Sequence, residues 1–222
     1  MFDDQILHDL KNPLAGITGS VGLFLEGLLG PLDEDQKKQL ENIELSAKKL
    51  TLFLKELSVV GCAENGQLTV GKTAFRADEL VPELDWIKRL AAKEEKSIAL
   101  GIEEKLSLTA DRELTALVLQ DLLHNAVRQT ERGGRAGLTV TDKKKDGLLF
   151  ELVSNGSSSF PSEQLAHVFE KDFRTKHQEL KMMTSPGAGF YFCKLAVEAQ
   201  GGQIGIESRP GLTRLFFRLP AG

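Results

Sequence analysis

A histidine followed by a carboxylate near the start of the chain is the first feature that could do chemistry. His8 and Asp9 lie in a stretch with helical spacing, and Asn12 follows His8 by one helical turn on the same face. Because His8 follows the apolar Leu7 by about 100° of rotation, its side chain should point outward. Pro13 should bend the helix beside it, since proline removes a helix hydrogen bond. An exposed histidine oriented by a carboxylate can act as a nucleophile. The alternative is a solvated histidine on an amphipathic helix.

Two helices with a narrow apolar seam must position this histidine. Their apolar residues recur at alternating spacings of three and four, a pattern typical of helices packed in a bundle. The seams comprise Leu7, Leu10, Leu14, Ile17, Val21, Phe24 and Leu28, and then Leu40, Ile43, Ala47, Leu50, Leu54 and Leu57. Gly30 and Pro31 should end the first helix, and Asp33 should cap the second. Because two such helices cannot bury both seams alone, we expect a homodimer that forms a four-helix bundle.

The composition changes after Cys62, where the helical seam ends. Alternating or β-rich patterns predict strands over residues 67–70, 97–102, 137–141, 148–154, 203–207 and 212–219. Helical patterns are found over residues 77–93, 112–131, 161–169 and 189–200. We therefore expect a helical hairpin domain over residues 1–64 and an α+β sandwich over residues 68–222, with a largely antiparallel sheet in the sandwich.

Composition and charge exclude several classes of protein. The net charge of −4 over 222 residues leaves no basic footprint for nucleic acid, and 41% hydrophobic residues exceed what a disordered chain carries. Cys62 and Cys193 are too few for a disulfide scaffold, and they show no metal-ligand spacing with the 4 histidines. No segment reaches the roughly 18 apolar residues of a membrane span, and the acidic start does not resemble a signal peptide. We expect a cytoplasmic segment that contacts neither nucleic acid nor membrane.

Several short motifs occur in the order and spacing of one known family. Residues 8–14 resemble the H-box of sensor histidine kinases, and residues 27–60 resemble their dimerisation and histidine-phosphotransfer hairpin. Residues 112–130 resemble the N-box helix of the GHKL-type ATP-binding domain, residues 168–174 its F-box, and residues 187–189 the opening of its G2 box. The resemblance covers essentially the whole chain, and it rests on the order of the motifs more than on any single one.

The resemblance implies a role for each matching residue. His8 would accept and donate a phosphoryl group, Asp9 would be the adjacent general base, and Asn12 would orient water when a partner is dephosphorylated. Asn125 would help to hold Mg²⁺, and Arg128 would meet the nucleotide phosphates. The implied partner is the receiver domain of a response regulator, whose aspartate would exchange the phosphoryl group with the histidine.

The other implied nucleotide positions lie in two loops and a lid. Asn155 stands where the family has an aspartate that accepts from the adenine amino group. Gly187 and Gly189 open the second glycine-rich loop, and residues 175–186 would form the lid over the nucleotide.

Departures from the family pattern gather on this nucleotide site. They are Asn155 for aspartate, Ser157 and Ser159 for two glycines, Tyr191 for a third glycine, Asp121 for an N-box asparagine, and Gln129 where an aromatic is common. A Cβ at a position that needs glycine costs energy, and an extra carboxylate repels a triphosphate unless Mg²⁺ bridges the two. We therefore expect ATP binding to be weak or lost, so that no cofactor is certain.

Three hypotheses follow for the function. The first is a dimeric phosphorelay protein, a histidine phosphotransferase in which His8 exchanges a phosphoryl group with a receiver aspartate and the second domain is vestigial. The second is an active sensor histidine kinase that phosphorylates His8 from Mg-ATP. The third is a scaffold that dimerises and sequesters a receiver without chemistry. The departures in the nucleotide site favour the first.

Overall fold

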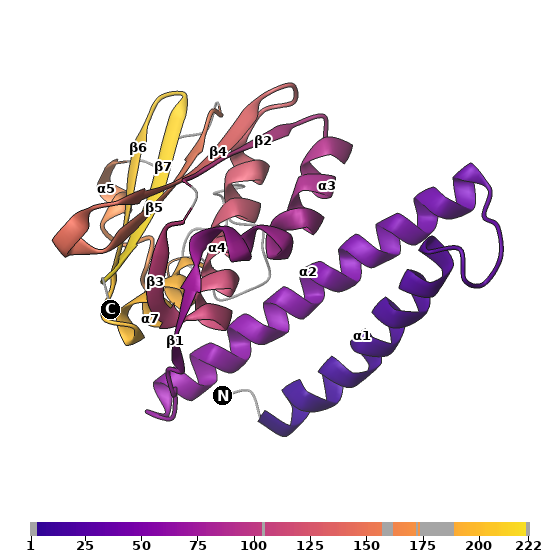
Figure 1. Cartoon of the computed structure of the whole chain (residues 1–222), viewed down its shortest axis with the longest axis horizontal. Helices are drawn as coiled ribbons and strands as arrows, with labels where there is room; N and C mark the ends of the chain where they lie inside the picture. Colours follow the sequence, from indigo (N-terminus) through magenta and orange to yellow (C-terminus); the bar gives the residue numbers. More distant parts are fainter. Residues whose placement is uncertain (1–3, 104, 157–161, 172, 174–188, 221–222) are drawn as a thin grey trace.

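The chain folds as an N-terminal helical hairpin followed by an α/β sandwich (Figure 1). The computed structural model describes residues 4–103, 105–156, 162–171, 173 and 189–220. The hairpin is formed by α1 (Asp4–Leu25) and α2 (Glu34–Glu64). Within the described residues, no helix combines the length and the apolar character that a bilayer span requires.

The connection between α1 and α2 is set by local chemistry. α1 ends at Leu25, earlier than predicted from Gly30, because Gly27 takes a left-handed conformation with φ +75°. The predicted cap of α2 is confirmed. The side chain of Asp33 accepts from the N–H of Gln36 at 2.7 Å, and the Gln36 side chain accepts from the N–H of Asp33 at 3.1 Å.

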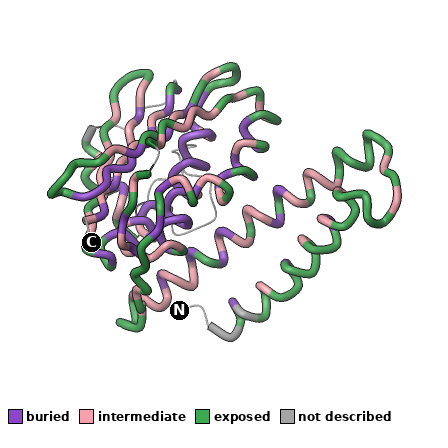
Figure 2. The backbone as a smooth tube through the Cα atoms, in the orientation of Figure 1, coloured by how far each residue is buried: buried purple, intermediate pink, exposed green. Residues whose placement is uncertain are grey.

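The predicted seams of the hairpin are divided between buried and exposed positions. Leu7 and Leu14 of α1 pack against Ala47 and Leu54 of α2 and are buried. Other seam residues are exposed in this single chain, among them Leu10, Ile17, Phe24, Leu28, Ile43 and Leu50. Figure 2 shows α1 as largely exposed along its length. The hairpin on its own therefore buries only part of its apolar surface.

The sandwich is built on one five-stranded and one two-stranded sheet. Its strands are β1 (Lys72–Arg76), β2 (Ser97–Ile102), β3 (Ser107–Asp111), β4 (Arg135–Asp142), β5 (Leu148–Ser154), β6 (Gln203–Arg209) and β7 (Leu212–Leu219). The large sheet has the order β2-β4-β5-β7-β6, in which β2 runs parallel to β4 and the other neighbours are antiparallel. β1 pairs with β3 in the small sheet. The predicted hairpin-plus-sandwich class is confirmed.

Helices form a layer between the large sheet and α2 (Figure 1). The helical elements of the sandwich are η1 (Ala77–Leu84), α3 (Asp85–Lys93), α4 (Arg112–Gln129), η2 (Lys144–Asp146), α5 (Ser162–Leu165) and α7 (Phe190–Ala199). α4 packs on β4 and β5 and against α7. In the sheet beneath, the fully buried rings of Phe150 and Phe217 stack with centroids 4.5 Å apart. This core holds α4 in place, and α4 carries the predicted N-box residues.

Two local predictions were wrong. The strand expected at residues 67–70 lies instead at Lys72–Arg76, and its partner β3 was not predicted. Both strands are short, and in β1 only Phe75 is buried, so the alternation that marks a strand is almost absent. The helix expected over residues 77–93 is divided between the 3₁₀ helix η1 and α3, with Pro82 inside η1.

Candidate functional site

The predicted phosphotransfer residues lie in the first half of α1. His8 follows Leu7, which is buried against α2, and the His8 side chain lies outside the described part of the chain. Asp9 and Asn12 are exposed. Pro13 lies inside α1 without ending it. The acidic and amide groups that flank the histidine are therefore accessible to a macromolecular partner.

A cleft separates this part of α1 from the sandwich. Lys11 of α1 and Lys55 of α2 line two adjoining cavities, of about 360 and 790 Å³, together with Glu83 and Gln120 of the sandwich. The turn of α1 that follows His8 thus faces an open space, lined by both charged and apolar side chains, rather than a packed interface.

On α4, the N-box residues form a buried polar cluster with α2 and α7. Asp121 is 0% exposed and Asn125 is 4% exposed, one turn apart on the same helical face. The thiol of Cys193 donates to Oδ2 of Asp121 over 3.3 Å. Glu56 of α2, which lies close to Asp121, is 1% exposed. Burial raises the pKa of Asp121 to about 6, because loss of hydration disfavours the ionised carboxylate.

Cationic and aromatic groups surround the next turns of α4. Arg128 is half-buried, and burial together with this cation lowers the pKa of Lys49 on α2. His124 is buried beside Trp86, with ring centroids 5.8 Å apart. Burial lowers the pKa of His124 to about 3, so this histidine is neutral and serves packing.

The described glycine-loop residues have distinct structural roles. Asn155 is exposed, and its carbonyl accepts from the N–H of Glu131 at 3.3 Å. A Cβ on Gly156 would lie 1.9 Å from the carbonyl oxygen of Gln129, so Gly156 allows β5 to approach the end of α4. Gly189 precedes α7 with φ +54° and ψ −137°, a conformation that favours glycine. Gly187, Ser157, Ser159 and the predicted lid over residues 175–186 lie outside the described residues.

The donor set on α4 matches what a nucleotide-bound Mg²⁺ would need. Asn125 offers an amide oxygen and Asp121 a carboxylate, and hard oxygen donors are the ligands that Mg²⁺ prefers. Oδ1 of Asp121 is buried, and it has no hydrogen-bond partner among the described residues. A buried oxygen that accepts no hydrogen bond is a position at which a bound cation would supply the missing partner. The residues present therefore fit the metal, with Arg128 one turn further along α4.

Glu56 is the member of this cluster that sequence reasoning missed. A glutamate on an amphipathic helix is usually solvated, and no motif marks this one. A signal was present: Glu56 lies in line with Leu45, Leu52 and Val60, a second apolar face of α2 beside the seam.

Known protein families match both the hairpin and the sandwich. The family described as "Histidine kinase-, DNA gyrase B-, and HSP90-like ATPase" matches residues 110–222. The family described as "His Kinase A (phospho-acceptor) domain" matches residues 4–66. Sensor protein KdpD of Clostridium acetobutylicum is 28% identical over 219 residues, which is 97% of this chain and 24% of that protein. Sensor protein SrrB of Staphylococcus aureus is 23% identical over 224 residues, which is 99% of this chain and 37% of that protein.

Solved structures share the fold. Full-length ShkA in complex with AMPPNP aligns with a TM-score of 0.67 and 18% identity, over 98% of this chain and 45% of that one. The histidine kinase AdeS of Acinetobacter baumannii aligns with a TM-score of 0.62 and 17% identity, over 97% of this chain and 98% of that one. The chain spans well under half the length of the curated relatives named above. With a phospho-acceptor hairpin followed by an ATPase fold, the chain belongs to the sensor histidine kinases of the histidine kinase-, DNA gyrase B- and HSP90-like ATPase family.

Proposed function

We propose that this chain is the catalytic part of a two-component sensor kinase, in which His8 takes a phosphoryl group from Mg-ATP and passes it to an aspartate of a receiver domain. The observation that carries this proposal is the joining, in one chain, of a phospho-acceptor hairpin and an ATPase fold whose α4 holds fitting Mg²⁺ donors. The two domains are the hairpin over residues 1–64 and the sandwich over residues 68–222.

Each residue near the histidine has a defined task in this proposal. The Asp9 carboxylate holds the proton on one imidazole nitrogen of His8 so that the other can attack phosphorus. Asn12, exposed one turn further on, positions a water for the return reaction, in which the receiver loses its phosphoryl group. Much of the rate comes from holding the groups in line.

On the sandwich, Asn125 and Asp121 hold the metal and Arg128 faces the phosphates. Bound Mg²⁺ supplies charge neutralisation at the transferring phosphoryl group. Asn155, Gly187 and Gly189 complete the nucleotide site, with the Asn155 side chain toward adenine.

Packing offers a second explanation for three of the departures from the family pattern. Gln129 is buried, and its Oε1 accepts from the Ser154 hydroxyl at 3.4 Å, which joins α4 to β5. Asp121 accepts from the Cys193 thiol at 3.3 Å, and the Tyr191 hydroxyl donates to Glu64 of α2 at 3.3 Å. Because these substitutions have partners within the protein, they do not require a loss of nucleotide binding. This favours the active kinase over the vestigial domain that the sequence suggested.

One observation favours a second candidate function, a phosphotransferase that does not use ATP. Asp121 and Asn125 are both buried, so the metal-binding face is closed in this conformation. A protein fixed in this state would exchange a phosphoryl group between His8 and a receiver without ATP.

Both candidates require a homodimer. The exposed seam residues Leu10, Ile17 and Phe24 on α1, with Ile43 and Leu50 on α2, form an apolar face that a second hairpin would cover. Four helices would then share one core. The partners proposed here are thus a second copy and a receiver domain.

Labelling with radioactive ATP tests the proposed function. The full chain with Mg²⁺ should gain an acid-labile label that His8→Gln abolishes, and a cognate receiver should then remove it. Asn12→Ala should keep the labelling and slow the dephosphorylation of the receiver. Absence of label from ATP, with label gained from a phosphorylated receiver, would replace the kinase by the phosphotransferase. Absence of label from either source would leave a scaffold.

A further inference from the structure

Asn155 lies where the end of β5 comes close to the end of α4, and its backbone is held there. Its carbonyl accepts from the N–H of Glu131 at 3.3 Å. The next residue, Gly156, lies so close to the Gln129 carbonyl that a Cβ would not fit. The side chain of Asn155 is exposed, and no described residue forms a hydrogen bond with its amide. A fixed backbone therefore carries an amide group that is free to turn.

The amide of Asn155 differs from a carboxylate in what it can bind. An ionised carboxylate only accepts hydrogen bonds, so it favours the amino group of adenine and repels the carbonyl oxygen that guanine carries at the same ring position. An amide has an accepting oxygen on one side and a donating nitrogen on the other, and a half turn about its last bond exchanges the two. Asn155 can therefore meet either group at position 6 of a purine.

Gln129 at the end of α4 is a second, independent sign of a ligand at this place. Its side chain is 6% exposed, and its Oε1 accepts from the hydroxyl of Ser154, the residue before Asn155, at 3.4 Å. Its Nε2 is buried and has no acceptor among the described residues. A buried donor without an acceptor costs free energy. An accepting atom of a bound molecule would therefore stabilise the Gln129 amide.

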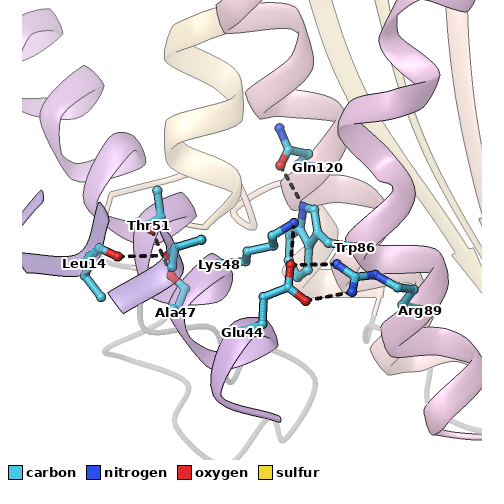
Figure 3. A network of polar contacts seen from close by, with 9 residues as sticks. Leu14, Glu44, Ala47, Lys48, Thr51, Trp86, Arg89 and Gln120 are labelled. Carbon is cyan, nitrogen blue, oxygen red and sulfur yellow. Dashed lines mark hydrogen bonds and ion pairs between the residues drawn. The ribbon is translucent and has the colours of Figure 1, made fainter. Parts of the chain in front are cut away.

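The helix that carries Gln129 is anchored along its length. Nε1 of Trp86 on α3 donates to Oε1 of Gln120 on α4 at 2.9 Å (Figure 3). Leu119 and Leu122 of the same helix are fully buried in the core of the sandwich. Gln129 therefore presents its donor from a rigid element, whereas the exposed amide next to it can adapt to the ligand.

We propose that Asn155 and Gln129 read position 6 of the purine, and that the site binds GTP as well as ATP. The amino group of adenine donates to Oδ1 of Asn155. After the half turn of the amide, the carbonyl oxygen of guanine accepts from Nδ2 of Asn155, and Nε2 of Gln129 is a second donor for the same oxygen. This inference rests on the proposed kinase function and extends its substrate class to both purine nucleoside triphosphates.

Calorimetric titration of the full chain with Mg-ATP and with Mg-GTP measures the ratio of the two dissociation constants. In the parent chain the two constants should agree within about threefold. Asn155→Asp should shift the ratio toward ATP by about 30-fold or more, because the carboxylate has no donor for guanine. Gln129→Met keeps the length of the side chain and removes its donor, so it should shift the ratio toward ATP by about tenfold. A uniform loss of affinity would leave the ratio unchanged.

Asn65→Asp is the matched control, because Asn65 is also an exposed asparagine that precedes a glycine, and it should leave the ratio unchanged. Mg-GTP binding that is about 100-fold weaker than Mg-ATP binding would overturn this inference and leave the proposed kinase function standing. An unchanged ratio in Asn155→Asp or in Gln129→Met would overturn the role of that residue. Absence of binding by either nucleotide, in both the parent chain and Asn155→Asp, would overturn the proposed kinase function and the purine specificity together.

Discussion

Gly156 lies where the end of β5 comes close to the end of α4, and its replacement by alanine should lower the free energy of unfolding. The added Cβ would lie 1.9 Å from the carbonyl oxygen of Gln129, whereas ordinary contact begins at 3.4 Å. The two backbone segments would have to separate by about 1.5 Å. That movement breaks the hydrogen bond from Glu131 N–H to the Asn155 carbonyl. Overpacking and the lost bond together should lower the free energy of unfolding by about 2–4 kcal/mol.

Urea unfolding of the full chain measures this cost, and Gly137→Ala is the matched control. Gly137 lies in β4, and nothing stands within 4 Å of the Cβ that alanine would add there. The control should change the free energy of unfolding by less than about 0.5 kcal/mol. If Gly156→Ala were as mild as the control, the close approach of β5 and α4 would be refuted.

Three further perturbations test the packing around the site. Below pH 6.5 the contribution of His124 to stability should fall by about 1.4 kcal/mol per pH unit, because the unfolded state takes up a proton that folded His124 refuses until about pH 3. The raised pKa of Asp121 acts in the opposite direction below about pH 6, so the slope is measured as the difference in urea unfolding free energy between the parent chain and His124→Asn at several pH values; a difference that does not change with pH would contradict the burial of a neutral His124. Phe150→Ala should cost about 3–5 kcal/mol in the same assay, because it removes a fully buried ring stacked on Phe217. Asp33→Ala should cost about 1 kcal/mol in thermal unfolding, since it removes the capping box with Gln36.

The hairpin could be predicted from the sequence because its seams repeat over many turns. The spacing could not show which seam residues face the partner helix within one chain. Leu7 and Leu14 are buried here, whereas Leu10 and Ile17 are exposed, although all four share one pattern. The difference arises because residues 3 or 4 apart lie on the two flanks of one stripe.

The chemistry of the site could be predicted only where it is local in the sequence. His8, Asp9 and Asn12 lie within two turns of one helix, so their grouping follows from spacing alone. The partners of Asp121 and Tyr191 are Cys193 on α7 and Glu64 on α2, which lie far away in the sequence. The sequence alone therefore suggested that these two residues damage a nucleotide pocket, whereas the structure gives each a hydrogen-bond partner within the protein.

Calorimetric titration of the full chain with ATP and Mg²⁺ tests the central claim, that the sandwich is a working nucleotide site. We predict saturable binding that requires Mg²⁺ and is lost in Asn125→Ala. Absence of binding by the parent chain up to about 1 mM nucleotide would contradict it.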